Sequence, residues 1–195
     1  TNGSGTLSFQ SVSGGGSLPT LVPTRNLVLS AVLSSGSQNI NDTYRYYCWD
    51  TSADTADLKY TTGTTQGANS LIHIKGSGDY LISSNLYVAD GGVSGGSGTW
   101  MAVALYTGQN NNTARGTLDY EYYLDAMYNS DDAATHDKSL MGGSLRINIS
   151  DAMVSAGCQI EVVSRRLFSA NTSGTSNCDA SGSKIHIEKY AYAYS

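Results

Sequence analysis

The sequence predicts an all-β domain, either a sandwich or a barrel. Runs of strand-forming residues alternate with clusters of Gly, Ser, Asn and Asp about every ten residues, which is the spacing of short antiparallel strands. The 195-residue chain is long enough to bury the core of one large domain. Proline occurs only 2 times, so the 22 glycines punctuate strands and do not mark a Pro-rich disordered chain.

The first half of the chain supplies five strand candidates in order. Residues 25–33 form a short apolar run, and residues 43–50 are rich in aromatic, strand-forming side chains. Residues 55–62 lead into a glycine turn. Residues 69–76 alternate isoleucine with leucine and histidine, and residues 79–88 alternate apolar with polar side chains, as a half-buried strand does.

The second half supplies five more. Residues 99–107 are the most apolar run and predict a strong strand, followed by the tyrosine-rich residues 117–129. Residues 144–150 place Leu and Ile on one face against Arg and Asn on the other. Residues 158–168 and 184–195 continue the same alternation, so eight to ten strands are expected in total.

Glycine- and serine-rich segments separate these candidates. Residues 90–98 and 170–183 are predicted to be polar loops, and residues 151–157 a turn. The first 20 residues have little hydrophobic periodicity, and we expect them to form an extended Gly/Ser-rich arm. A single domain is expected to follow over residues 21–195.

The order of several segments resembles the globular heads of the tumour necrosis factor and complement type, trimeric jelly rolls that viral spikes and head fibres also use. "IHIKGSGDYLISSNLYV" resembles the family's apolar strand followed by the Gly-x-Tyr opening of the next one. "WMAVALYTG" resembles the strand after it, and "IHIEKYAYAYS" the aromatic last strand. "SLRINISDAMVSAGCQIEVVSRR" resembles a strand pair that the family separates by Leu-x-x-Gly-Asp, with "SAGC" in place of Gly-Asp. Over residues 25–195 the resemblance implies an antiparallel jelly-roll sandwich, here with the extended N-terminal arm.

The resemblance also implies a subunit interface. Alternation along residues 79–88 directs one face to the core, namely Tyr80, Ile82, Ser84, Leu86 and Val88. In the family the opposite face lines a threefold axis, so the expected interface residues are Leu81, Ser83, Asn85, Tyr190, Tyr192 and Tyr194. Two alternatives stay open: a sheet face exposed to solvent, and tyrosines that pair across strands within one subunit.

No set of residues in the sequence matches a catalytic or metal-binding pattern. His73 and His186 alternate with apolar neighbours inside predicted strands, which favours structural or interface roles. His136 lies in the acidic segment 131–137, whose spacing matches no known cation-binding loop, so a solvated loop is the better interpretation. We therefore expect no enzymatic activity, no cofactor and no metal.

The three cysteines match no zinc-binding spacing. Cys158 and Cys178 could bridge across the polar loop between them, which would leave Cys48 unpaired. Three unpaired thiols are an equally open alternative.

Charge and hydropathy limit the partners. The net charge is −5 and no basic cluster exceeds Arg165-Arg166, which argues against nucleic-acid binding. No apolar run approaches the about 18 residues of a membrane-spanning helix. The expected partners are two further copies in a homotrimer, other virion proteins bound through the arm, and host surface glycans or a receptor.

Together these features predict a non-enzymatic structural protein of the virion surface. A capsid decoration protein, head fibre or spike subunit would be attached as a trimer through residues 1–20. One alternative is a secreted trimeric ligand or a carbohydrate-binding recognition head in an extracellular setting. Another is a jelly-roll protein of the capsid shell itself.

Overall fold

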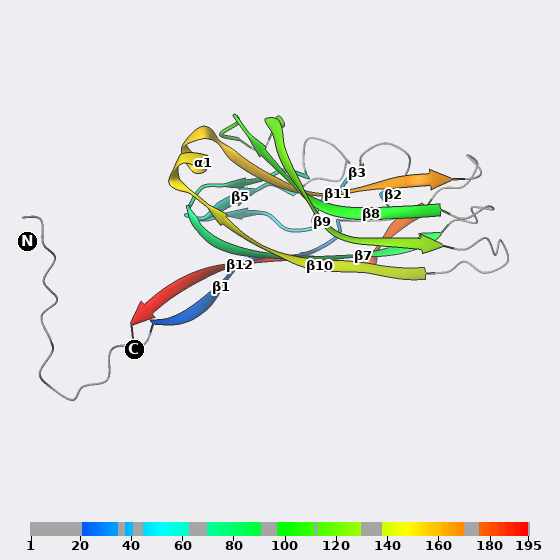
Figure 1. Cartoon of the computed structure of the whole chain (residues 1–195), viewed down its shortest axis with the longest axis horizontal. Helices are drawn as coiled ribbons and strands as arrows, with labels where there is room; N and C mark the ends of the chain where they lie inside the picture. Colours follow the sequence, from blue (N-terminus) through cyan, green and yellow to red (C-terminus); the bar gives the residue numbers. More distant parts are fainter. Residues whose placement is uncertain are drawn as a thin grey trace, which may run out of the picture.

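The computed structural model shows two antiparallel sheets packed face to face, so the predicted all-β sandwich is confirmed (Figure 1). It describes residues 21–34, 38–40, 45–62, 70–90, 97–111, 113–129, 138–169 and 176–194. These residues form twelve strands, more than the eight to ten expected, because five of the strands have only two or three residues. The predicted arm, residues 1–20, lies outside the described residues.

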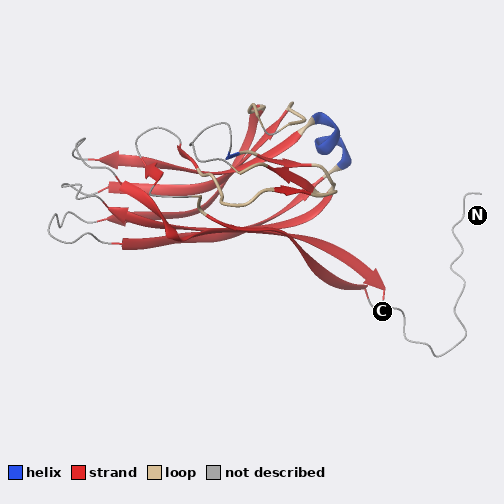
Figure 2. Ribbon diagram, turned by 180° about the vertical axis from the view of Figure 1, so that it is seen from behind, coloured by secondary structure: helices blue, strands red, loops and turns tan. Residues whose placement is uncertain are grey.

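The five-stranded sheet has the order β1-β12-β7-β10, and β2 also pairs with β12. Its strands are β1 (Leu21–Val32), β2 (Gln38–Ile40), β7 (Gly78–Asp90), β10 (Lys138–Ile149) and β12 (Ser176–Tyr194). β12 pairs with β7 only as far as Tyr190, but with β1 as far as Tyr194. The ends of β1 and β12 therefore leave the sandwich as a two-stranded ribbon (Figures 1 and 2).

The seven-stranded sheet has the order β4-β5-β6-β11-β8-β9, and β3 also pairs with β11. Its strands are β3 (Arg45–Tyr46), β4 (Ala53–Asp54), β5 (Leu58–Tyr60), β6 (Ile72–Ile74), β8 (Ser97–Thr107), β9 (Thr117–Asn129) and β11 (Cys158–Ser169). The chain changes sheet after β2, β6, β7, β9, β10 and β11. Several strands that are neighbours in a sheet, such as β12 and β7, are therefore distant in sequence, as in a jelly roll.

The main core lies between the sheets and is built from period-two alternation. All five residues of β7 that were predicted to face it are buried, at 4% exposure or less: Tyr80, Ile82, Ser84, Leu86 and Val88. Ile185 and Ile187 of β12 and Met101, Val103 and Leu105 of β8 complete the two walls. Burying each large apolar side chain contributes roughly 1.5–3 kcal/mol.

A second, smaller cluster covers the outer face of the seven-stranded sheet. Its buried residues are Leu71, Trp100, Ala102, Ala104, Tyr106 and Val163, with Tyr46 packed against them. The segment after β8 lies over the same face, because the side-chain amide of Gln159 donates to the Ala114 carbonyl at 2.8 Å and accepts from the Gly116 amide at 2.9 Å. The middle of this sheet, β8 and β11, is therefore covered on both sides by its own chain.

Two predicted connections are different in the structure. The loop expected over residues 170–183 is wrong from residue 176 onward, because β12 begins there and Cys178 pairs with Val88. Burial of Cys178 and Ser183 outweighs the turn-forming composition of this stretch. Residues 151–156 form helix α1, which Ser150 caps by accepting from the Met153 amide at 3.3 Å, and not the simple turn that was expected.

The cysteine alternatives are resolved in favour of thiols. Cys48, Cys158 and Cys178 are all free and buried. The bridge between Cys158 and Cys178, which the sequence left open as one alternative, is absent. The two residues lie on strands of different sheets. Cys178 instead donates to the hydroxyl of Tyr47 at 3.4 Å.

Candidate functional site: the outer face of the five-stranded sheet

The outer face of the five-stranded sheet is the open broad face of the sandwich. The register aligns its outward side chains in four cross-strand rows, each running from β1 through β12 and β7 to β10. The rows are Val32-Lys184-Asn85-Gly142, Ser30-His186-Ser83-Ser144, Leu27-Glu188-Leu81-Arg146 and Arg25-Tyr190-Asp79-Asn148. Directly opposed residues share a face in an antiparallel sheet, so these sixteen positions form one surface.

The small polar residues of this surface are hydrogen-bonded within the chain. The hydroxyls of Ser83 and Ser144 lie 2.8 Å apart across β7 and β10. The side-chain amide of Asn85 donates to the Gly182 carbonyl at 3.0 Å. A partner can therefore cover these groups without leaving them unsatisfied.

Four of the five charged residues on this surface, all but Lys184, are also paired internally. Arg25 lies 3.3 Å from Glu188, and Arg146 lies 3.2 Å from Asp79. The ring of Tyr190 lies between the two arginines, whose guanidinium carbons are 5.9 and 4.8 Å from its centroid. Such exposed pairs contribute little stability alone, about 0–1 kcal/mol, but they leave this part of the face electrically balanced.

Apolar side chains lie between and beside the polar rows. Leu27 is 62% exposed and Leu140 is 61% exposed, while Leu81 is half-buried at the centre of β7. Single exposed apolar residues are ordinary on protein surfaces. Here they share one face with polar residues that are mostly hydrogen-bonded or ion-paired within the chain. The combination suits a surface that another protein covers.

The structure brings four of the six predicted interface residues onto this face. Leu81, Ser83, Asn85 and Tyr190 all point outward from β7 and β12, and none is fully buried. The backbone of Tyr192 and Tyr194 belongs to the ribbon, where these residues pair with Pro23 and Leu21, and their side chains lie outside what the structure describes. Contact with another subunit remains a prediction for all six.

A second exposed aromatic patch was not recognised in the sequence. It lies on β9, the last strand of the seven-stranded sheet, where Leu118 and Tyr123 are 46% and 66% exposed and share the outer face with Tyr106 and Ala102. Tyr120, 58% exposed, lies opposite Leu105 on the other face of the strand. Tyr123 packs edge-on against Trp100 of β8, with ring centroids 5.2 Å apart. The dense tyrosines of "TLDYEYYLDAMYN" were the available signal.

The described residues contain no group of His, Cys, Asp and Glu that could hold a metal ion. His73 lies half-buried in β6, where burial and then Lys75 and Lys59 lower its pKa. His186 is exposed on the outer face, and His136 with its acidic segment lies outside the described residues. None of the described helices is long and apolar enough to cross a membrane.

Comparison with solved structures returns murine APRIL and Eiger TNF among its matches, at low sequence identity. Murine APRIL at pH 8.0 is 12% identical with a TM-score of 0.48, over 85% of this chain and 99% of that chain. At pH 5.0 the identity is 14% and the TM-score 0.44, over 84% and 98%. Eiger TNF from S. frugiperda is 12% identical with a TM-score of 0.45, over 91% and 97%. No family model and no curated protein matches the sequence.

Proposed function

We propose that this chain is a non-enzymatic recognition head that assembles as a homotrimer through the β7 and β10 side of the outer face of its five-stranded sheet, around Leu81. The observation that supports this proposal most directly is the difference between the outer faces of the two sheets. The seven-stranded sheet buries most of the outer face of β8 and β11 under the cluster around Trp100 and Tyr106, and among the described residues of β8, β9 and β11 it exposes large apolar side chains outward only at β9. The five-stranded sheet presents an open lattice of paired charges and exposed leucines.

Two exposed apolar surfaces on different sheets are compatible with a closed ring of three subunits. A threefold ring needs a head-to-tail contact, in which one surface of a subunit meets a different surface of the next. The outer face around Leu81 supplies one surface. The β9 patch, Leu118 and Tyr123, supplies another on the outer face of the other sheet. Tyrosine is well suited to such a contact because it gives a large area with few rotors to order.

For the setting of the head, we favour the alternative of an extracellular ligand or recognition module. The virion interpretation depends on residues 1–20 as an attachment arm, and that segment lies outside the described residues. Nothing in the described part of the chain favours a capsid surface or a capsid shell. The resemblance to tumour necrosis factor-type heads favours a protein that displays its loops to a partner.

Assembly can be tested by analytical ultracentrifugation of the full chain, whose mass is 20.5 kDa. We expect the wild type to sediment with the mass of three chains. Leu81→Asp and Tyr123→Asp should each dissociate the trimer, because each places an unpaired charge in one half of the same contact. Ala152→Asp, on the exposed face of α1, is the matched control and should leave the trimer intact.

A monomeric wild type at micromolar concentration would overturn the proposal. A trimer that persists in both aspartate variants would show that these two surfaces do not form its contact. Circular dichroism of each variant distinguishes dissociation from loss of the fold.

A further inference from the structure

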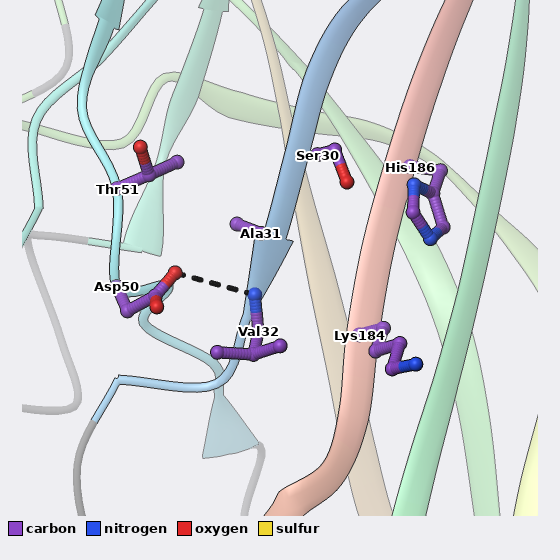
Figure 3. Close-up of a pocket in the computed structure, with 7 residues that line it drawn as sticks. All are labelled: Ser30, Ala31, Val32, Asp50, Thr51, Lys184 and His186. Carbon is purple, nitrogen blue, oxygen red and sulfur yellow. Dashed lines mark hydrogen bonds between the residues drawn. The ribbon is translucent and has the colours of Figure 1, made fainter.

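A pocket of about 430 Å³ lies where β1 ends beside β12. It is lined by Ser30, Ala31, Val32, Asp50, Thr51, Lys184 and His186 (Figure 3). Its volume falls in the range of small-molecule sites. The lining is mostly polar, and it combines potential donors on β12 with an acceptor beyond β1.

Two nitrogen donors stand together on one side of this pocket. Lys184 and His186 are two residues apart on β12 and both point to the outer face. Alternate residues of a strand lie roughly 6.5 Å apart, so an ammonium and an imidazole N–H can reach the same anionic group. Figure 3 shows both side chains on the β12 side, with Ser30 next to His186.

Lys184 differs from the other lysines whose contacts the structure describes. Lys59, Lys75 and Lys189 each lie within 4 Å of an aspartate, at 3.7, 2.7 and 2.5 Å. Within the described residues Lys184 has no such carboxylate. Its neighbours across β1 and β7, Val32 and Asn85, are uncharged. In a chain of net charge −5, this leaves one cationic position open to an external anion.

The opposite wall of the pocket is held in place by the backbone. Oδ1 of Asp50 accepts from the Val32 amide at 3.2 Å, and the Asp50 amide donates to the Val32 carbonyl at 3.0 Å. These two bonds fix Asp50 and Thr51 across β1 from Lys184 (Figure 3). The wall thus presents a carboxylate that can accept from hydroxyl groups and a Thr hydroxyl that can donate or accept.

We infer that this pocket binds an acidic sugar unit, with the anionic group on Lys184 and His186 and the ring hydroxyls on Asp50, Thr51 and Ser30. A simple anion would use only the β12 side, whereas an acidic sugar uses both. The inference gives the proposed recognition head a ligand class and rests on that function. For a monosaccharide in an open pocket, the Kd is expected to be on the order of 1 mM.

Saturation-transfer NMR on the full chain tests the site with three probes: glucuronate, glucose and acetate. Glucuronate should bind saturably and at least about tenfold more tightly than either of the others, because only glucuronate combines charge with hydroxyl groups. Lys184→Met should weaken glucuronate binding by about tenfold or more. Lys59→Met removes the same charge from an exposed lysine outside the pocket and should leave binding unchanged.

Asp50→Asn tests the hydroxyl-binding side of the pocket independently of the anion-binding side. It should weaken glucuronate, because asparagine replaces one acceptor oxygen for the ring hydroxyls with a donor, and it should not weaken acetate, because removing a negative charge does not disfavour an anion. Equal affinity for glucuronate and acetate, no saturable binding, or unchanged binding in Lys184→Met would each overturn the inference. Sedimentation of the same samples reports assembly separately, so a monomer that still binds glucuronate contradicts the trimer and supports the site.

Discussion

The guanidinium of Arg115 holds the carboxylate of Glu161 with two hydrogen bonds, Nε to Oε2 at 2.8 Å and Nη2 to Oε1 at 2.6 Å. The Glu161 side chain is fully buried on the outer face of the seven-stranded sheet, and Ser70 also donates to it. The guanidinium carbon lies 3.5 Å from the centroid of the Tyr46 ring. This polar cluster fastens the segment after β8 to the sheet.

Removing the arginine should destabilise the protein strongly. Arg115→Ala leaves a buried carboxylate without its charged partner, and we expect the free energy of unfolding to fall by about 3–5 kcal/mol. The double variant Arg115→Ala/Glu161→Gln should lose less, because the buried charge is gone. Urea unfolding at pH 7 measures both, and a double variant less stable than the single one would contradict this account.

The buried thiols should be chemically silent in the folded protein. Burial raises the pKa of Cys48 and Cys158 to about 11 and that of Cys178 to about 12. Since the thiolate is the nucleophile, a disulfide-exchange reagent at pH 8 should react with native protein far more slowly than with a free thiol. In guanidinium chloride without reductant, all three should titrate, and a count of one would instead indicate a disulfide.

The half-buried His73 should make stability depend on pH. Burial, Lys75 and Lys59 lower its pKa in the folded state, whereas the unfolded value is about 6.5. The unfolded chain then binds the proton more tightly. The contribution of His73 to the free energy of unfolding is therefore complete above the unfolded pKa, and it is lost as the pH falls through and below that value. His73→Gln should flatten the decline of stability between pH 7 and 5, measured by urea unfolding, and an unchanged slope would refute the assignment.

Two glycines with similar φ angles offer a matched comparison. Gly108 and Gly157 have φ of 93° and 87°, in the region that disfavours other residues. A Cβ at Gly108 would meet nothing within 4 Å, whereas one at Gly157 would lie 2.5 Å from the backbone of Gln109. We expect Gly108→Ala to cost about 1 kcal/mol and Gly157→Ala clearly more, in thermal unfolding. Equal losses of stability in the two variants would show that the φ angle, and not the contact with Gln109, determines the cost.

The alternation of apolar and polar residues in the sequence predicted which face of several long strands is buried. In β7, apolar residues at every second position identified the core face, and the same period in β12 separated Ile185 and Ile187 from His186. The resemblance added the placement of Leu81, Ser83 and Asn85 on an outer face. The internal partners of these residues, such as Ser144, come from β10 and required the register.

What could not be predicted depends on contacts between distant segments. The start of β12 at Ser176 has the composition of a loop, and pairing with β7 makes it a strand. Glu161 alternates as a solvent-facing residue should, but Arg115, 46 residues earlier in the chain, covers it. The pocket beside Lys184 likewise depends on Asp50, which the fold brings to the end of β1.

The projecting ribbon also determines how the head responds to mechanical force. Leu21 and Tyr194 pair with each other at the end of the ribbon. The ribbon projects from the end of the sandwich opposite to the start of β8, the end of β9 and the start of β10 (Figure 1). A pull that separates these two residues opens the ribbon like a zipper, one cross-strand pair at a time, before it reaches the sandwich. A tether joined to either residue alone transmits its tension into β1 or β12 along the strand, where many hydrogen bonds share the load.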